Sequence, residues 1–443
     1  MTSRDMLVGG GATLRLEDAL RRVLDGWSAL PAEEVGPDEA LGQVLAAPVV
    51  ASTSLPPWDN SAMDGYAVRS ADVAHASPGT PVRLRVLGEV AAGHVPPRAV
   101  TPGSALRIMT GAMVPEGSDS IVPVEDTDAP PGVAELPGVV GIRAPAAPGA
   151  NVRSAGEDVR SGALVLAAGR LVGPAAIALA AAAGAARVSV HRRPRVGILA
   201  TGDELMPAGT PLPPARIHDS NTPALLAQAR ASGAVATSFG IAPDEPASLR
   251  ERLATAVAES DVVVLSGGVS VGAHDHVRDA FSSLGTVDFW RVAIQPGKPL
   301  AFGRTLAGRA GDRTDPDRPV ALFGLPGNPV SAFVTFELFV RPLLRLLLGE
   351  QPREGVPGAR RRVRGTLTEA VSKAPGRRAF LRVRVEADPS RPDGLVVRPA
   401  GGQGSHVLSA LAAADGLAIV PEELPGLPAG AEVDVLMLDG EGA

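Results

Sequence analysis

The sequence predicts a multidomain α/β plus β protein built around a central doubly wound, mostly parallel α/β domain. From about residue 191, short apolar runs alternate with helical segments, the pattern of a parallel sheet covered by helices on both faces. On either side, at 48–150 and beyond 349, apolar and polar residues alternate between frequent turns, which indicates small β modules. A chain of 443 residues can build three or four such domains.

The N-terminal elements are expected to be helical. Residues 14–30 carry apolar side chains at helical spacing and opposite charges four residues apart, which predicts an amphipathic helix that packs or forms a dimer. A second short helix is expected at 37–45. After the β module, Gly173-Pro174 opens an apolar helix that ends near residue 184.

The α/β domain is predicted to begin with a strand and to end with a long helix. Its strands are expected at 195–200, 235–239, 262–265, 287–292 and 320–323. Its helices are expected at 223–231, 247–258, 277–284 and 329–348, the last kinked at Pro342. Strands of a C-terminal β-barrel-like domain are expected at 361–368, 379–385, 395–398, 417–420 and 433–438.

Composition excludes several classes of function. The net charge is −6 and only 3% of residues are aromatic, so neither a nucleic acid nor an anionic membrane is expected as a partner. The chain has no cysteine, which removes disulfides, thiolate metal sites and thiol nucleophiles. The N-terminus lacks an apolar core of signal-peptide length, and the longest apolar span, 175–183, falls far short of about 20 residues. We expect a soluble, cytoplasmic protein.

Two glycine-rich turns follow predicted buried strands. They are Ser266-Gly-Gly-Val-Ser270 and Gly324-Leu-Pro-Gly-Asn-Pro-Val-Ser331. Glycine lets the chain turn tightly and bring backbone N–H groups up to an anion. Asn328 and Pro329 are placed as the N-cap and first residue of a helix, whose N-terminus adds a positive partial charge. The turns predict a phosphate or other oxyanion at the carboxyl edge of the sheet.

No nucleotide-binding P-loop and no His-Glu-x-x-His motif occurs in the chain, and His274 with His276 makes a poor zinc site. Acidic residues stand in turns instead, at Asp59 with Asp64, Glu157-Asp158, Asp203-Glu204, Asp244-Glu245 and Asp275. Scattered carboxylates of this kind suit Mg²⁺, which takes one or two of them plus phosphate oxygens. Each also has a structural explanation, such as a turn residue at Asp64 or a helix N-cap at Asp244.

Three further residues suit an oxyanion. Lys298 lies between two prolines in Gln295-Pro-Gly-Lys-Pro299, where the stiff turn would present a point charge. Arg377 follows a Pro-Gly turn, and Ser405 is a hydroxyl in a glycine-rich loop. The residues alone therefore predict an enzyme with an α/β phosphate-binding core and Mg²⁺, acting on a phosphorylated or nucleotide-linked molecule.

The ordered set of motifs resembles the molybdopterin molybdenumtransferase family, the bacterial proteins similar to the C-terminal E domain of gephyrin. The resemblance runs nearly end to end and rests on seven segments: Asp59-Asn-Ser-Ala-Met-Asp-Gly-Tyr-Ala67, Arg107-Ile-Met-Thr-Gly-Ala112 with Val114-Pro-Glu-Gly117, Gly156-Glu-Asp158, Thr201-Gly-Asp-Glu204, Ser266–Ser270, Pro296-Gly-Lys-Pro299 and Gly324–Ser331.

The resemblance implies transfer of molybdenum from molybdate to the dithiolene of adenylated molybdopterin, with Mg-dependent release of AMP. It also implies an elongated homodimer with a shared active site. The four implied domains are an elongated helical/extended linker domain (1–50 and 151–190), a small mostly-β domain (51–150), an α/β domain that binds molybdopterin (191–348) and a C-terminal β-barrel-like domain (349–443). The molybdopterin adenylyltransferase is a possible further partner.

The resemblance also assigns roles to matching positions. Asp64 and Asp158 would reach in from the partner subunit, whereas Glu204, Asp244 and Asp275 would position the metal, the nucleotide end and the attacking water. Residues of the glycine turns would hold phosphate and pterin: Ser266, Gly267, Gly268, Gly324, Pro326, Gly327, Asn328 and Ser331. Those at the molybdate end would be Ser270, Gly297, Lys298, Arg377 and Ser405.

One departure and three alternatives belong to this interpretation. Many relatives carry a lysine where this chain has Gln295, which predicts weaker molybdate binding. An adenylyltransferase would share the α/β domain, but the segments at 59–67 and 156–158 argue against it. A scaffold with an idle site is disfavoured because the carboxylates are present. A tungsten-handling variant stays open, because the two oxyanions nearly match in size and charge.

Overall fold

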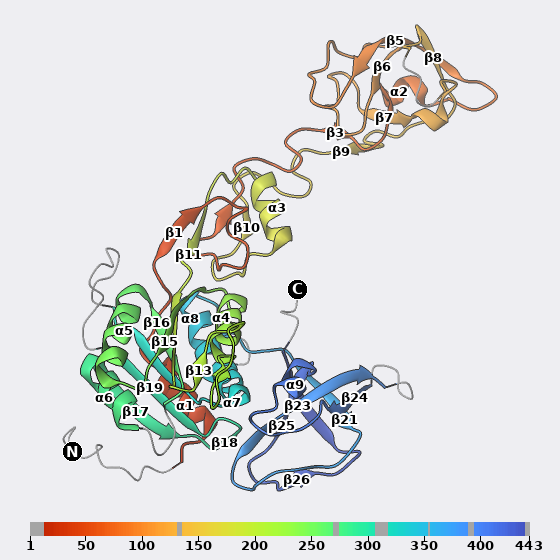
Figure 1. Ribbon diagram of the computed structural model, residues 1–443. Coiled ribbons are helices and arrows are strands. Elements are labelled where there is room, and N and C mark those ends of the chain that lie inside the picture. The colour runs from red at the N-terminus through yellow and green to blue at the C-terminus, as the bar shows by residue number, and fades with distance from the viewer. Residues whose placement is uncertain are drawn as a thin grey trace.

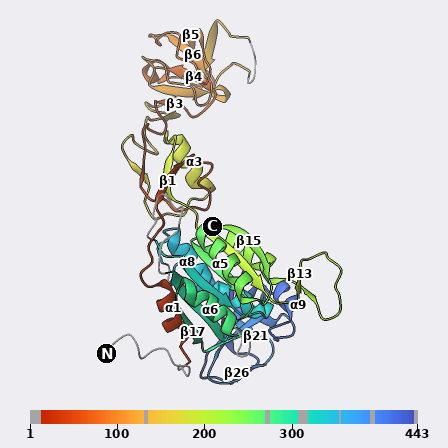
Figure 2. The same ribbon diagram turned by 60° about the vertical axis from the view of Figure 1, so that its left-hand side comes forward.

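The computed structural model describes residues 13–130, 135–268, 274–305, 318–352, 355–388 and 394–438. The molecule is elongated (Figures 1 and 2): a small β domain forms one end, a slender linker the middle, and the α/β domain and a β-barrel the other end. The multidomain α/β plus β class that the sequence predicts is therefore confirmed.

Helix α1 (Leu16–Leu24) packs against the α/β domain. It has acidic residues in its first turn and basic ones in its last, which favours the helix dipole. Ala19 and Val23 are fully buried in the cluster that contains Phe339 and Leu343 of the α/β domain. The N-terminal segment was expected to belong to the linker, but this helix lies on the α/β core; the domain boundaries stay a prediction.

The linker is made of two short antiparallel ribbons and one helix. Its elements are β1 (Ala32–Val35) with β11 (Val188–His191), β2 (Val49–Val50) with β10 (Leu164–Leu166), and α3 (Pro174–Ala182). The helix expected at 37–45 is wrong: turns occupy this segment, and Val44 and Leu45 form β-bridges to Leu171 and Val190. Gly42, at φ +75°, breaks any helix there.

The small β domain is a sheet with strand order β7-β4-β6-β5-β8. Its elements are β4 (Gly65–Val68), α2 (Ser70–Val73), β5 (Val82–Val90), β6 (Ser104–Ile108), β7 (Ser120–Pro123), the 3₁₀ turn η1 (Val124–Asp126) and β8 (Val139–Ile142). A two-residue pairing, β3 (Asn60–Ser61) with β9 (Val152–Arg153), joins it to the linker (Figure 1).

The α/β domain has one mixed sheet with strand order β15-β12-β16-β20-β19-β17. The strands are β12 (Arg195–Thr201), β15 (Val235–Ala242), β16 (Val262–Ser266), β17 (Gly285–Arg291), β19 (Pro299–Thr305) and β20 (Ala321–Leu325). The first four in the sheet are parallel; β19 runs antiparallel to both of its neighbours, β20 and β17, so β17 has the same direction as the first four. The sequence prediction missed β19, whose Pro-Leu-Ala-Phe-Gly-Arg-Thr run lacks clear alternation. A short pair, β13 (Leu205–Met206) with β14 (Ile217–His218), lies outside this sheet.

Helices cover both faces of this sheet. On one face, α5 (Pro246–Glu259) and α6 (His274–Leu284) enclose a core with Leu253 and Phe281. On the other, α4 (Asn221–Ala231), α7 (Pro329–Thr335) and α8 (Arg341–Leu347) join α1. The expected disturbance at Pro342 is a π-helical turn, η2 (Phe336–Val340), directly before α8. A proline has no N–H to donate to the preceding turn, so that turn widens.

The C-terminal domain is a closed five-stranded barrel, because β23 pairs with β25 as well as with β24. Its strands are β21 (Arg362–Leu367), β23 (Arg378–Ala387), β24 (Leu395–Pro399), β25 (Gly416–Val420) and β27 (Glu432–Met437); the short elements are β22 (Val371–Ser372), β26 (Gly426–Leu427) and α9 (Leu408–Ala412). Strand β18 (Ile294–Gln295), which comes from the α/β domain, adds to β23 in parallel. The two domains therefore share a sheet.

We predict that Gly65→Ala destabilises the small β domain. A Cβ at Gly65 would lie 2.0 Å from the backbone oxygen of Val122, so strands β4 and β7 must separate. The expected cost is about 1–3 kcal/mol or more, seen as faster hydrogen exchange of both strands by mass spectrometry. Gly79→Ala is the matched control, because no atom lies within 4 Å of its Cβ position. Equal exchange in the two variants would contradict the prediction.

Candidate functional site

The carboxyl ends of the four parallel strands lie side by side at one edge of the α/β sheet. The register pairs Thr201 with Ala242 and aligns Ser266 with both Ala200 and Leu325. Each strand is followed at once by one of the polar or glycine-rich loops that the sequence singled out. Parallel pairing thus brings four separate chain segments to one place, which is where open α/β sheets bind ligands.

The two glycine turns lie against each other. Gly267 has φ +103°, and a Cβ there would lie 2.4 Å from the backbone oxygen of Thr201, so only glycine fits. Its N–H donates to Leu325 O at 3.1 Å. The Cα of Gly267 is also the nearest atom to the Cβ position of Gly327, at 3.8 Å. Bare backbone from both turns therefore lines the strand ends, as an anion site requires.

Asn221, which the sequence prediction missed, holds these turns together. Its side-chain N–H₂ group donates to Ser266 Oγ and to the backbone oxygen of Gly327, both at 2.8 Å. The carboxylate of the buried Asp219 accepts the N–H groups of Asn221 and Thr222, each at 3.0 Å, and fixes the start of α4. The available signal was the polar run His218-Asp-Ser-Asn-Thr222 before a helical segment.

Three exposed acids stand at the ends of β12 and β15. Thr201 Oγ1 donates to Asp244 Oδ1 at 2.9 Å, and the backbone N–H of Asp244 donates to Asp203 Oδ1 at 3.2 Å. The Glu204 carboxylate folds over Gly202, whose Cβ position lies 2.5 Å from its Oε2. The N-cap of α5 is Glu245, so Asp244 does not hold that position.

These carboxylates have the chemistry that Mg²⁺ prefers, one or two acidic oxygens with open positions for phosphate and water. Within the described ranges, no group of three or more His, Asp or Glu residues comes close enough to hold a metal by itself. Of the expected site residues, Ser270 and the Asp275 side chain lie outside what the structure describes. The described part thus fits a metal shared with a substrate's phosphate.

The other two expected acids lie elsewhere in the molecule. Asp64 lies in the turn between β3 and β4, and Asp158 follows β9, where the linker meets the small β domain (Figure 1). The backbone N–H of Ala155 donates to Asp59 Oδ1 at 2.7 Å and ties their two loops together. One chain therefore does not bring these acids to the α/β edge.

The surroundings of Asp64 are polar on one side and apolar on the other. Its Oδ1 accepts the backbone N–H of Thr110 at 2.6 Å and the Thr110 hydroxyl at 2.7 Å, and these two bonds lower the pKa of Asp64. Nearby in the chain, Trp58, just before β3, and Met63, next to Asp64, are 44% and 40% exposed. The chain around Asp64 therefore exposes two large apolar side chains as well as the acid.

The turn that carries Lys298 packs on helix α7. A Cβ at Gly297 would lie 2.6 Å from Thr335 Cγ2 of that helix. The Lys298 side chain is exposed, and among the described residues its ammonium has no hydrogen bond or ion pair. Gln295 Oε1 is buried and has no hydrogen-bond partner in the same part of the chain. The turn therefore offers one free cation and one unsatisfied amide.

The barrel reaches the same helix through the glycine-rich loop at 401–405. The backbone N–H of Val330, in the first turn of α7, donates to Ser405 O at 3.1 Å. Asn328 is the N-cap of α7 by position, although its side chain makes no capping hydrogen bond. Arg377 is half-buried and directly precedes β23, the strand that pairs with β18. Ser405 and the Lys298 turn thus both lie against α7.

Arg382 is the second residue that the sequence prediction missed. It is fully buried in β23, and one Nη donates to the backbone oxygens of Gly402 and Gly404 at 3.0 and 3.1 Å. Its Nε and other Nη have no partner among the described residues, and burial lowers its pKa. A buried guanidinium with free donors requires an anion or water. The signal was an arginine inside the apolar run Ala379-Phe-Leu-Arg-Val383.

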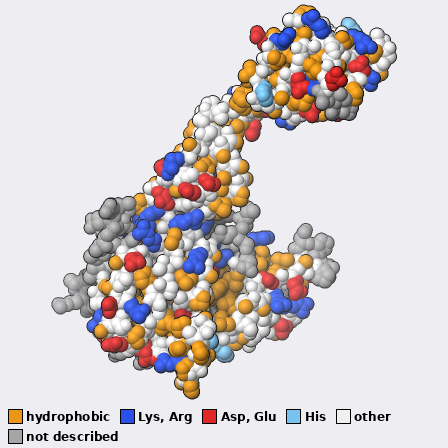
Figure 3. Space-filling view, turned by 45° about the horizontal axis from the view of Figure 1, so that its top comes forward, with side chains coloured by type: hydrophobic (Ala, Val, Ile, Leu, Met, Phe, Trp, Pro, Cys, Tyr) orange, Lys and Arg blue, Asp and Glu red, His pale blue; other side chains and the backbone are white. Residues whose placement is uncertain are grey.

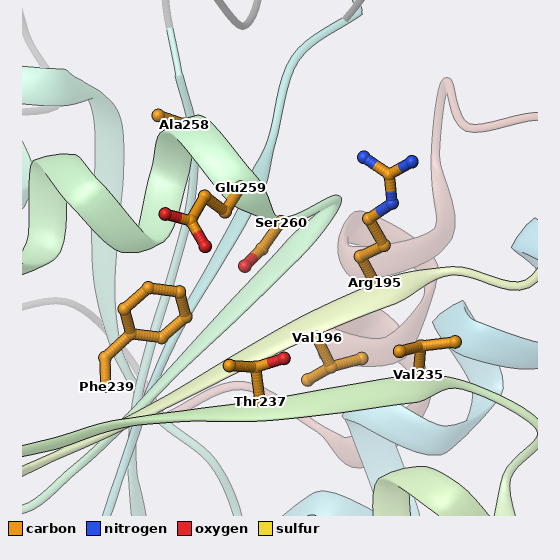
Figure 4. A pocket seen from close by; sticks show the side chains of 8 residues that line it. All are labelled: Arg195, Val196, Val235, Thr237, Phe239, Ala258, Glu259 and Ser260. Carbon is orange, nitrogen blue, oxygen red and sulfur yellow. The ribbon is translucent and has the colours of Figure 1, made fainter. Parts of the chain in front are cut away.

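Two hollows open on the α/β domain, at opposite edges of the sheet. One of about 710 Å³ lies at the carboxyl edge, lined by Gly202, Asp203, Arg216, Asp219, Pro243 and Arg252 among others. The second, of about 340 Å³, lies at the amino edge between β15 and the end of α5, lined by Arg195, Thr237, Phe239 and Glu259 (Figure 4). The first is lined by Asp203, one of the acids at the strand ends, and its volume suits a small-molecule ligand.

The visible surface carries charges of both signs. Figure 3 shows acidic and basic side chains interspersed over the lobe of the α/β domain and barrel, without one large basic field. This pattern agrees with the net charge of −6. No helix in the described part of the chain is both long and apolar enough to cross a bilayer.

Three family models match the chain in order. A model described as MoeA N-terminal region (domain I and II) matches residues 14–184. One described as a probable molybdopterin binding domain matches 197–346, and one described as MoeA C-terminal region (domain IV) matches 364–438. The matches cover the linker and small β domain, the α/β domain and the barrel.

Individual relatives match over almost the whole chain. Molybdopterin molybdenumtransferase 2 of Mycobacterium tuberculosis is 41% identical over 404 residues, covering 90% of this chain and 93% of the relative. Molybdopterin molybdenumtransferase of Staphylococcus aureus is 31% identical and covers 99% of both. The crystal structure of a molybdopterin biosynthesis MoeA protein from Pyrococcus horikosii superposes with a TM-score of 0.77 at 34% identity, covering 97% of this chain and 100% of that one.

We predict that Thr110→Val raises the pKa of Asp64 toward its ordinary value of 3.8, because one of the two hydrogen bonds to the charged form is lost. The stability that the bonds contribute is complete above that ordinary value and is lost as pH falls through the lowered one. A titration of the Asp64 carboxylate followed by NMR measures the change. Ser118→Ala, in the same domain, is the control. If Asp64 titrates unchanged in Thr110→Val, the hydroxyl makes no such bond in solution.

Proposed function

The chain belongs to the molybdopterin molybdenumtransferase family of molybdenum cofactor biosynthesis, and we propose that it transfers molybdenum from molybdate to the dithiolene of adenylated molybdopterin with Mg-dependent release of AMP. The enzyme class follows from the family. The substrates, the metal and the role of each residue are the proposal. We also propose a cytoplasmic location and leave the molybdopterin adenylyltransferase as a possible partner.

The observation that carries the proposal is a continuous run of contacts from the glycine turns to the barrel. Asn221 joins Ser266 to Gly327, Asn328 and Pro329 lead into α7, and Val330 binds Ser405. The Ser405 loop in turn covers Arg382. Backbone N–H groups suited to phosphate therefore lie in one structure with a lysine, a hydroxyl and two arginines suited to a tetrahedral dianion.

The adenylated pterin is proposed to bind at the carboxyl edge. Its phosphates would lie on the backbone of the glycine turns, where Ser266, Gly267, Gly268, Gly324, Pro326, Gly327, Asn328 and Ser331 meet. The adjacent hollow of about 710 Å³ is large enough for one ring system of this substrate. Its rim carries Arg216 and Arg252, whose planar guanidinium groups can stack on a ring or bind phosphate.

Molybdate is proposed to bind between the Lys298 turn and the barrel loop. Lys298 offers an ammonium that has no partner in the described part of the chain, beside Gly297 and, in the resemblance, Ser270. Ser405 and Arg377 approach from the barrel. Arg382 is a stronger candidate than Arg377 for the guanidinium, because its Nε and one Nη, which have no partner among the described residues, are already desolvated under the Ser405 loop. Placing the dianion there satisfies donors that otherwise cost free energy.

The acids at the edge are proposed to hold Mg²⁺ and to orient water. Glu204 and Asp244, with Asp275, would offer carboxylate oxygens beside the phosphate turns. When bound, Mg²⁺ would offset the negative charge of the phosphoanhydride. Thr201 fixes Asp244 through its hydroxyl and leaves that carboxylate's second oxygen free to accept a proton from water. The water oxygen would then bond to the adenylyl phosphorus as the P–O bond to the pterin's phosphate breaks, and AMP would leave. Two Mo–S bonds would replace one molybdate oxygen, which leaves as water with the two dithiol protons, so molybdenum stays at +6.

A second copy of the chain is proposed to complete the site. Asp64 and Asp158 lie far from the α/β edge of their own chain in the elongated molecule (Figure 1). They are exposed, and Trp58 and Met63 beside them are available to a partner surface. A homodimer in which each small β domain covers the partner's α/β edge would unite all five acids.

We predict that Asp64→Asn and Glu204→Gln each lower AMP release from adenylated molybdopterin on the order of a hundredfold, as expected for lost acid–base residues. Mixing the two variants and letting dimers re-form should restore about a quarter of the wild-type activity, since half the dimers then carry one intact site. AMP and pterin-bound molybdenum are counted together.

The matched controls are Asp126→Asn in the small β domain and Glu259→Gln at the amino edge, which should retain full activity. If AMP release persists in both site variants, the acids are misassigned. If single variants fail but mixing restores nothing, each site is made by one chain.

We predict that Gln295→Lys lowers the molybdate concentration for half-maximal insertion by about tenfold, the value of one added charge-assisted hydrogen bond. The new ammonium would replace a buried amide oxygen that has no partner among the described residues. Gln295→Met is the neutral control of similar length and should bring no gain. If the molybdate concentration for half-maximal insertion is unchanged in Gln295→Lys, a positive charge at position 295 does not strengthen molybdate binding.

A further inference from the structure

We propose that Arg378 is a positioning residue, which ties the barrel to helix α1 and so sets the separation between Lys298 and the Ser405 loop. The inference rests on the proposed function, because it concerns the molybdate end of that site. The sequence pattern does not single out Arg378; it predicts the neighbouring Arg377, which follows the Pro-Gly turn, as the oxyanion ligand.

Arg378 binds two carboxylates that belong to different domains. Its Nε and one Nη donate to the two oxygens of Glu422 in the barrel, at 2.9 and 3.1 Å. Its other Nη donates to Glu17 Oε1 of α1 at 2.6 Å. Arg15, just before α1, lies 3.6 Å from Glu422 Oε1. The bidentate geometry makes this a directed contact rather than a loose surface pair.

The network is partly protected from solvent. Arg378 and Glu422 side chains are only 21% and 18% exposed, whereas Glu17 is 50% exposed. The hydrogen bond from Arg378 is the main cause that lowers the pKa of Glu422, and burial opposes it. Salt therefore screens the Arg378–Glu422 ion pair less than it screens an exposed pair. The Arg378–Glu17 ion pair is the weaker of the two.

The backbone of Arg378 lies at the junction of the two domains. Its N–H donates to Ala293 O at 2.8 Å, and the residue pairs with Ile294, one position before Gln295 and the turn to Lys298. The Val330 N–H also donates to Ser405 O near the site, and Phe380, Leu417 and Leu438 of the barrel are buried in the same apolar cluster as helix α1. Helix α1 is held in the α/β core by Ala19 and Val23. The ion network anchored on α1 thus adds directed hydrogen bonds to this apolar packing and fixes the orientation of the barrel beside the Lys298 turn.

The consequence differs between the two substrates. The adenylated pterin is proposed to bind loops of the α/β domain, which do not depend on the barrel. Molybdate is proposed to bind between a turn of the α/β domain and a loop of the barrel. Loosening the barrel should therefore weaken molybdate binding and leave the pterin's KM unchanged, whereas general structural damage would move both.

The experiment compares Arg378→Met, Arg378→Lys and Glu17→Gln with wild type in the full-length protein. Arg378→Met should raise the molybdate concentration for half-maximal insertion about three- to tenfold, at an unchanged KM for adenylated molybdopterin. Glu17→Gln should give a smaller rise, and Arg378→Lys should recover part of the loss. Arg364→Met is the matched control, since Arg364 pairs with Asp434 on the barrel surface at 2.9 Å.

A second measurement does not depend on activity. Because the chain has no cysteine, Glu251→Cys on α5 and Ala387→Cys on β23 allow spin labels on each domain. Their distance distribution should broaden in Arg378→Met and stay narrow in Arg364→Met. Unchanged half-saturation and unchanged distances in an active Arg378→Met protein would overturn the positioning role. Absence of molybdenum transfer in the wild type would instead overturn the proposed function, and the distances alone would then decide the role of Arg378.

Discussion

The parallel pairing of β12, β16 and β20 is the constraint on which the site depends. Parallel strands in register end at one edge, so the residues after Thr201, Ser266 and Leu325 are neighbours although long segments separate them in the chain. The close approach of Gly267 to the backbone of Thr201 then leaves no room for a side chain at position 267. Backbone donors and short polar side chains are what remains, and they bind oxyanions.

The barrel contributes chemistry that the α/β sheet lacks. A sheet edge rich in backbone N–H groups suits phosphate, but a second dianion nearby needs full positive charges as well. Arg382 meets that need at a cost, because burying a guanidinium without a carboxylate lowers its pKa and leaves donors unsatisfied. Such a residue is tolerated where a ligand supplies the missing partner, and its position under the Ser405 loop is consistent with that use.

The elongated shape separates two sets of acids that the proposed reaction needs together. The linker holds the small β domain away from the α/β edge of its own chain. If two copies of the chain lie antiparallel, acids that are far apart within one chain are close together across the two chains. In this arrangement a single chain would have no complete site, since neither the small β domain nor the α/β domain carries all the acids.

The sequence by itself determined the elements whose signals are local. Strands β12, β15, β16 and β20 are predicted because apolar runs end at glycine or polar turns, and α7 because Asn328 and Pro329 open it. The glycine turns and the acids of the site were found for the same reason. The family resemblance then supplied roles that no single motif could assign.

Tertiary structure alone decided the rest. Residues 37–45 form turns because β-bridges from the linker capture Val44 and Leu45, and β19 is a strand because β17 and β20 flank it. Asn221, Arg378 and Arg382 gain their roles from partners far away in the sequence: Ser266 and Gly327, Glu17 and Glu422, and the loop at 401–405. A side chain's hydrogen-bond partners depend on which segments the fold brings together, and spacing along the chain does not contain that information.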